Sequence, residues 1–159
     1  MHCVLFIGAP ASGKSTFYQR RFFRTHLRIN LDMVRTRRRE RILVDACLAA
    51  RLAFVVDNTN PTPSDRARYL VPARAAGFTT VGYCFDCRLH ECLERNAHRS
   101  GNECIPDAAV RAIHRRLIPP DPEEGFDELY RVTLDGHGGF IVTPWPAATR
   151  RPGGCGSSR

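Results

Sequence analysis

The sequence predicts an α/β domain with a mainly parallel central sheet flanked by helices. Short apolar runs alternate with longer amphipathic segments along most of the 159 residues, a pattern typical of strands joined by crossover helices. Near the start, the glycine-rich stretch GAPASGKST separates an apolar run from an amphipathic one. A chain of this length suits one domain with a single sizeable core.

The first predicted elements are a strand, a helix, a second strand and a long helix. Residues 3–8 (CVLFIG) indicate a buried strand, and the segment from Lys14 through FYQRRFF indicates the first helix. A short strand is expected at 26–30 and a continuous helix over 32–51. Five side chains of that helix are expected to face the core: Val34, Ile42, Leu43, Cys47 and Leu48.

The middle of the chain repeats the alternation. Residues 52–57 (LAFVVD) predict a strand that ends in a carboxylate. A helix is expected over 63–76, because proline stands near its start and Gly77 follows its end. Residues 78–85 predict another strand, and a helix follows through about Ala97.

The last part predicts a helix and two strands. Residues 107–117 are amphipathic, and strands are expected at 129–135 and 139–143. We therefore predict one domain over 1–143 and a disordered tail over 144–159, which is rich in glycine, proline and serine.

Composition points to an anionic ligand. The net charge is +8 and the pI is near 9.6, and a small basic protein attracts nucleic acid or phosphorylated ligands. An arginine-rich surface that reflects composition alone would give the same numbers. We expect a cytoplasmic protein with reduced thiols, no membrane span and no obligate protein partner, because no export signal or ~20-residue apolar run is present.

The stretch GAPASGKST fits the phosphate-binding pattern G-x4-G-K-[ST]. Its glycines allow backbone N–H groups to close around phosphate oxygens, and the following helix N-terminus adds positive potential. Lys14, the sole lysine among 24 basic side chains, is expected to reach the β- and γ-phosphates of ATP, and Ser15 to ligate Mg²⁺. An arginine fork does not replace this compact ammonium. The predicted ATP-binding loop comprises Gly8, Ala9, Pro10, Ala11, Ser12, Gly13, Lys14, Ser15 and Thr16.

A cluster of polar residues follows each of the next two predicted strands. Asp32 and Arg35 are three residues apart, so on a helix both would face one substrate, although an ordinary surface pair has the same spacing. Asp57 ends a buried strand where P-loop enzymes keep a Mg²⁺-water partner, and Asn58 and Asn60 follow it at the sheet edge where α/β sites assemble. A turn that leads into Pro61 would also explain these side chains.

Several motifs together resemble the 5′-kinase domain of polynucleotide kinases, from about Val4 to Val132. They are GAPASGKSTF, INLDMVR, VVDNTNPTPSDRARYLVPARAAGF, CLERNAHR and PPDPEEGFDEL, in that order. The resemblance implies a P-loop kinase fold with a small arginine-bearing lid. Leu31 stands where relatives usually carry arginine, and no D-x-D-G-T phosphatase motif is present.

The resemblance also implies roles for single residues. Asp32 would be the general base for a 5′-hydroxyl, and Arg35 would contact the phosphate of the acceptor. Arg99 would be the lid arginine that clamps the transferring phosphoryl group, and Arg95 would support it and the bound ATP. Asp57, Asn58 and Asn60 would lie at the substrate.

Three functions remain open from the sequence. The first is phosphorylation of the 5′-hydroxyl of DNA or RNA by ATP and Mg²⁺. The second is the same chemistry on a small-molecule hydroxyl, and the third is a non-catalytic module that binds ATP and nucleic acid. One group of cysteine and histidine side chains suggests a zinc site, but its cysteines are better explained as small buried thiols. That group is Cys84, Cys87, His90, Cys92 and Cys104.

Overall fold

The computed structural model describes residues 1–99, 101 and 104–146, so the tail predicted over 144–159 lies mostly outside the described residues. Its strands are β1 (His2–Ile7), β2 (Leu27–Ile29), β3 (Phe54–Val56), β4 (Thr79–Phe85), β5 (Glu128–Leu134) and β6 (Phe140–Pro144). Its α-helices are α1 (Lys14–Arg21), α2 (Leu31–Val34), α3 (Arg37–Ala49), α4 (Pro63–Ala75), α5 (Leu89–Ala97) and α6 (Asp107–Arg116). A 3₁₀ turn, η2 (Pro122–Glu124), precedes β5.

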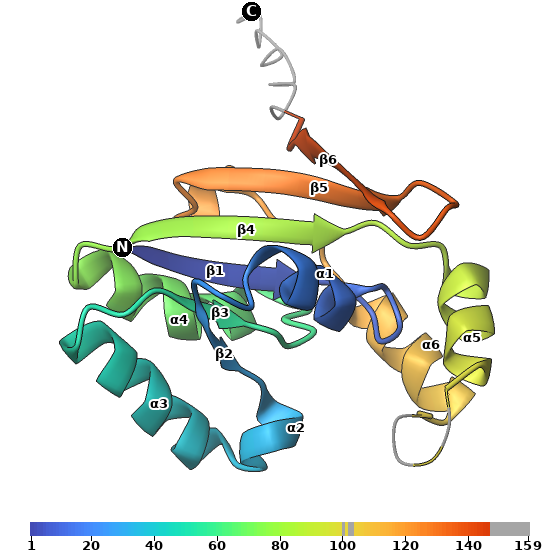
Figure 1. Cartoon of the computed structure of the whole chain (residues 1–159), viewed down its shortest axis with the longest axis horizontal. Coiled ribbons are helices and arrows are strands. Elements are labelled where there is room, and N and C mark those ends of the chain that lie inside the picture. Colours follow the sequence, from blue (N-terminus) through green and yellow to red (C-terminus); the bar gives the residue numbers. More distant parts are fainter. Residues whose placement is uncertain (100, 102–103, 147–159) are drawn as a thin grey trace, which may run out of the picture.

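The six strands form one sheet in the order β2-β3-β1-β4-β5-β6. All neighbouring strands are parallel except β5 and β6, which are antiparallel. The carboxyl ends of the parallel strands therefore meet at one edge, where α/β proteins bind ligands. Figure 1 shows α5 and α6 side by side beyond the ends of β1 and β4. The α/β fold class with a mainly parallel sheet is confirmed.

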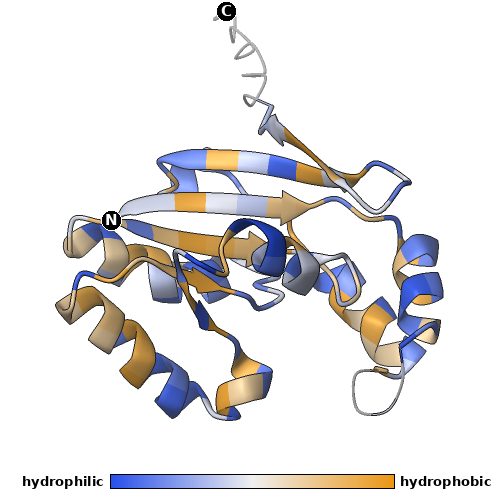
Figure 2. Cartoon of the chain, in the orientation of Figure 1, coloured by the Kyte–Doolittle hydropathy of each residue, from blue (hydrophilic) through white to orange (hydrophobic). Residues whose placement is uncertain are grey.

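Helices cover both faces of the sheet because the central strands β1 and β3 bury successive side chains, which point to opposite faces. Figure 2 shows these two strands largely in the hydrophobic colour. On β1, Cys3, Leu5 and Ile7 face a cluster that includes residues of α3 and α4. Val4 and Phe6 face the opposite cluster, which includes residues of α1. This alternation buries β1 from Cys3 to Ile7. The loop after β1 therefore starts at the centre of the ligand-binding edge.

The helix predicted over 32–51 is two helices. The backbone of Arg35 has φ 68°, which ends α2 after a single turn, and the Thr36 side chain then caps α3 by accepting from Arg39 N–H. On α3, Leu43, Cys47 and Leu48 face the core as expected. Ile42, also expected there, is 57% exposed, and Val44 is buried in its place.

A buried ion pair ties the segment after β3 to the connector after α6. The Arg66 side chain is fully buried and donates from Nε and Nη2 to the two carboxylate oxygens of Glu124, each at 2.6 Å. Its Nη1 donates to the carbonyls of Asn60 and Ile118, both at 3.1 Å. Arg66 therefore holds the polar segment that follows β3 in place.

Replacing Glu124 with alanine is expected to lower the free energy of unfolding by about 3–5 kcal/mol, because it leaves the Arg66 guanidinium buried without its carboxylate. Urea unfolding followed by circular dichroism measures the change. The neighbouring, exposed Glu123 provides the control: its replacement with alanine should change the free energy by less than about 0.5 kcal/mol. Equal unfolding midpoints for the two variants would contradict the assignment.

Among the described residues, no helix is both long and apolar enough to cross a membrane.

Candidate active site

The loop predicted to bind phosphate lies between β1 and α1. Gly13 caps α1 with a left-handed backbone, φ 99°, and a Cβ on Gly8 would lie 2.9 Å from Cβ of Phe85. Ala11 also has a left-handed backbone, φ 60°, a conformation that costs a residue with a side chain about 1–2 kcal/mol. The backbone therefore adopts the tight turn that the glycine spacing predicts, including one position where this chain carries alanine.

Lys14 begins α1 and turns back into this loop. Its Nζ donates to the carbonyls of Gly8 at 3.0 Å and Ala9 at 2.6 Å, and to Ser12 Oγ at 3.3 Å. The pKa of Lys14 is lowered to about 8, chiefly by burial and also by the charge of Arg99, while Asp57 and Asp32 oppose the change. The amine is thus held at the centre of the loop, with its charge only partly compensated.

The low pKa of Lys14 predicts that nucleotide binding weakens in base. Below pH 8 the amine is charged in the free protein, and above pH 8 it is neutral, whereas bound phosphate would favour the charged form. The affinity for ADP is therefore expected to fall about tenfold between pH 7 and pH 9, with proton uptake on binding. Isothermal titration in two buffers of different ionisation enthalpy measures both effects.

The control for this prediction is Lys14→Met, which removes the titrating group. Its affinity should be weaker but constant over the same pH range. A wild-type affinity that does not change between pH 7 and pH 9 would show that Lys14 keeps its charge in the free protein.

Ser15 and Asp57, predicted at the Mg²⁺ site, meet in the structure. Ser15 Oγ donates to Asp57 Oδ2 at 3.2 Å. A hydroxyl and a carboxylate are oxygen ligands of the kind Mg²⁺ prefers, so this pair fits the metal. The structure adds a residue that the sequence did not reveal. Arg28 of β2 donates hydrogen bonds to Ser15 Oγ and to Asp57 Oδ2.

Asp32 lies on α2 at the same edge of the sheet. Asn30 caps this helix through Oδ1, which accepts from the N–H groups of Asp32 at 2.9 Å and Met33 at 3.2 Å. The same amide donates to the Asp57 carbonyl, and Asn58 Oδ1 accepts from Leu31 N–H at 2.9 Å. Two side-chain amides therefore hold the single turn that carries Asp32 against the end of β3.

A second layer of polar contacts supports Asn58. Its Nδ2 donates to Glu40 Oε1 at 2.6 Å and to the Tyr69 hydroxyl at 3.2 Å, and Arg37 donates to the same two residues. Burial raises the pKa of Tyr69 to about 12, with Glu40 adding to the effect. The sequence did not reveal this network, since Glu40 looks like an ordinary surface residue of α3 and is in fact buried.

Several of the predicted site residues line one cavity of about 260 Å³. Its lining includes Lys14, Ser15, Asp32, Asp57, Asn58 and Arg99. Arg35 does not line it; it is the exposed cap at the end of α2, and Arg37 lines the cavity instead. Asn60 is buried outside the cavity, where its amide donates to the Phe6 carbonyl, so its position supports a structural role and not the predicted contact with substrate.

The arginines of the predicted lid have different partners. Arg95 of α5 donates from Nε to the Ala11 carbonyl at 2.8 Å, which links the helix to the phosphate loop, whereas Arg99 follows α5 and lines the cavity. Between them, Asn96 is buried and exchanges two hydrogen bonds with the backbone of Ile105. This amide fixes the return of the chain toward α6 and so supports the position of Arg99.

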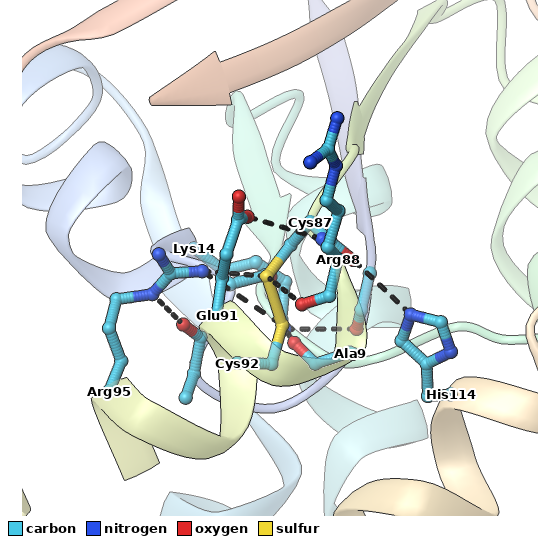
Figure 3. The surroundings of a disulfide bond; sticks show 11 residues. Ala9, Lys14, Cys87, Arg88, Glu91, Cys92, Arg95 and His114 are labelled. Carbon is cyan, nitrogen blue, oxygen red and sulfur yellow. Dashed lines mark hydrogen bonds between the residues drawn. A yellow bond between two sulfur atoms is a disulfide. The ribbon is translucent and has the colours of Figure 1, made fainter. Parts of the chain in front are cut away.

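The cysteines next to Arg95 correct one expectation. Cys87 and Cys92 form a disulfide, so the prediction of reduced thiols throughout is wrong for this pair. Figure 3 shows Arg95 beside the disulfide, with its guanidinium also close to Cys87. In the described part of the chain, no group of three or more histidine, cysteine or acidic residues is placed to hold a metal ion.

A larger cavity of about 680 Å³ lies on the other side of the phosphate loop. Ser12 lines it together with residues of α5, of β5, of the turn before β6 and of the start of β6, including Arg95, Arg131 and Phe140. The sequence analysis did not identify these residues. Ser12 belongs to the phosphate loop, so this cavity adjoins the same loop as the first one.

A family model described as an AAA domain matches residues 3–120. The "Bifunctional polynucleotide phosphatase/kinase" of Schizosaccharomyces pombe is 27% identical over 135 residues, which cover 81% of this chain and 33% of the relative. The chain therefore spans about a third of the length of that relative.

Two solved structures have a similar fold. Chaetomium thermophilum Kti12 in complex with ADP-AlF3 is 15% identical, with a TM-score of 0.68 over 84% of this chain and 89% of that one. A gluconokinase from Sinorhizobium meliloti 1021 is 19% identical, with a TM-score of 0.58 over 84% of this chain and 83% of that one. The chain belongs to the AAA-domain family, and its fold is that of the P-loop kinases.

Proposed function

We propose that this protein transfers the γ-phosphoryl group of ATP to the 5′-hydroxyl end of a nucleic acid. The observation that carries the proposal is the shared cavity, in which the Asp32 carboxylate lies with Lys14 of the phosphate loop and Arg99 of the lid. A pure binding module has no need of a carboxylate opposite the phosphates. A kinase needs one to orient and deprotonate the acceptor hydroxyl.

In the proposed reaction, each side chain has a separate task. Asp32 accepts the proton of the acceptor hydroxyl as its oxygen attacks the γ-phosphorus in line with the leaving oxygen. The phosphate loop and Lys14 hold the phosphates, while Arg99 stabilises the charge that spreads over the transferring group. Ser15 and Asp57 would hold Mg²⁺, which supplies charge neutralisation at the phosphates when bound.

Charge and similarity favour a nucleic-acid acceptor. The net charge is +8, and Arg38, Arg39 and Arg41 are exposed on α3, directly after the segment that carries Asp32. The relative from S. pombe carries "polynucleotide phosphatase/kinase" in its name. The gluconokinase with the same fold is the reason to test a small-molecule hydroxyl as the alternative acceptor.

The direct test is transfer of label from γ-labelled ATP to a 5′-OH oligonucleotide. Label is expected on DNA or RNA ends, and none on the same oligonucleotide with a 5′-phosphate. The KM for the oligonucleotide should rise roughly tenfold between 50 and 200 mM salt if about two phosphates are contacted. Transfer to gluconate but not to any oligonucleotide would establish the small-molecule alternative, and ATP binding without transfer to either would establish the binding module.

A further inference from the structure

The guanidinium of Arg28 contacts both oxygens of the proposed Mg²⁺ site. Its Nη2 donates to Ser15 Oγ at 2.9 Å and to Asp57 Oδ2 at 2.6 Å, and its Nε donates to the same Asp57 oxygen at 2.9 Å. The Asp57 side chain is only 1% exposed, whereas that of Arg28 is 26% exposed. A buried carboxylate thus takes its counter-ion from a side chain that reaches the surface.

The register of the sheet accounts for this contact. Arg28 of β2 is paired with Val55 of β3, and Asp57 follows two residues later, so both side chains lie on the same face. Arg28 also lies over the Tyr18 ring, with its Cζ 5.4 Å from the ring centroid. The fork is therefore supported from one side and directed at Ser15 and Asp57.

A metal ion and this guanidinium make incompatible demands on the same two residues. Mg²⁺ requires lone pairs of the Ser15 and Asp57 oxygens, toward which Arg28 directs its N–H groups. Two cations that share one carboxylate at contact distance also repel each other strongly. Because Arg28 is partly exposed, it has room to withdraw, while Asp57 does not.

We infer that Arg28 is a resident counter-ion of Asp57 that competes with Mg²⁺ for the Ser15–Asp57 pair. The inference rests on the proposed function in one respect, that the site takes a nucleotide with Mg²⁺. Its consequence is that Arg28 sets the Mg²⁺ concentration at which the site accepts the metal. It also keeps the buried Asp57 carboxylate paired in the metal-free protein.

The experiment titrates Mg²⁺ into protein saturated with ADP and follows the fluorescence of Trp145, the only tryptophan of the chain, or the heat of binding. For Arg28→Gln, the Mg²⁺ concentration at half-saturation is expected to fall about fivefold or more, a coupling of ordinary size between competing ligands. Without metal, the variant should melt about 4 °C or more below wild type, because Asp57 has lost its counter-ion. Added Mg²⁺ should reduce this difference in melting temperature between the variant and wild type.

Two further variants keep the test decisive. Arg21→Gln removes the same formal charge at an exposed position on the last turn of α1, without touching Ser15 or Asp57, and its half-saturation should change less than twofold. Arg28→Lys keeps the charge but lacks the fork that holds both oxygens at once. In Arg28→Lys, the Mg²⁺ concentration at half-saturation should shift in the same direction as in Arg28→Gln, by a smaller factor. This variant replaces Arg28→Gln in the test if Arg28→Gln does not fold.

An unchanged or higher half-saturation in the Arg28 variants would overturn the inference, because Arg28 would then assist the metal or have no effect on it. A shift as large in Arg21→Gln would also overturn it, since net charge would explain the result. The titration needs no acceptor, so failure of the protein to label an oligonucleotide would refute the proposed function and leave this result standing.

Discussion

Replacing Arg99 with methionine is expected to lower the turnover of phosphoryl transfer by about 10³-fold or more, the range found when a charge-stabilising arginine is removed from such enzymes. Arg99 lines the cavity with Lys14 and is close enough to lower its pKa. In the proposed reaction this guanidinium is needed most when charge spreads over the transferring phosphoryl group. Methionine keeps the length and the apolar body of the side chain but removes the charge and the donors.

The measurement is single-turnover transfer from labelled ATP at saturating substrates, which separates chemistry from binding. Arg115→Met is the matched control, because Arg115 is exposed on the last turn of α6 and is absent from the lining of the cavity, so turnover should stay within twofold of wild type. An Arg99→Met enzyme that loses affinity for ATP but keeps its turnover would show that the arginine holds the nucleotide and does not act on the transferring group.

Replacing Asp32 with asparagine is expected to lower turnover by about 10²–10⁴-fold, the usual contribution of a positioned general base. Asparagine preserves the size of the side chain, and the turn is held by Asn30 and Asn58 through backbone N–H groups, so the fold should not change. The affinity for ADP should stay within a factor of about two to three. Thermal melting and ADP titration check these two expectations beside the transfer assay.

Met33 provides the control for Asp32. It lies next to Asp32 on α2, is 63% exposed and is absent from the lining of the cavity, so Met33→Leu should transfer label at the wild-type rate. If Asp32→Asn retains full turnover, another group accepts the proton of the hydroxyl, and the assignment of the base fails.

The local sequence predicted most of the secondary structure and the phosphate loop. β1, α1 and the loop between them follow from an apolar run, a glycine spacing and a helix start that are adjacent in the chain. The break at Arg35 escaped prediction because an apolar periodicity continues across it. Only the Thr36 cap and the left-handed backbone of Arg35 mark the end of α2.

The roles of the asparagines after β3 needed the structure. Asn58 and Asn60 have the same side chain and lie in the same motif, so the sequence assigned both to the substrate. In the structure Asn58 lines the cavity, whereas Asn60 is turned inward to the carbonyl of β1. The left-handed backbone of Asn60, φ 42°, accompanies that turn and cannot be inferred from residue type alone.

By itself, the sequence determined that this chain forms an α/β domain with a phosphate loop, because both are encoded by residues close together in the chain. Only the tertiary structure decided which polar side chains share a cavity, and that Arg28, Glu40 and Arg66 belong to the site or its support. The physical reason is that strand order and register bring Arg28 to Asp57, and the packing of α3 brings Glu40 to Asn58. A charged residue on a short strand or a helix carries no local sign of the partner that it will meet.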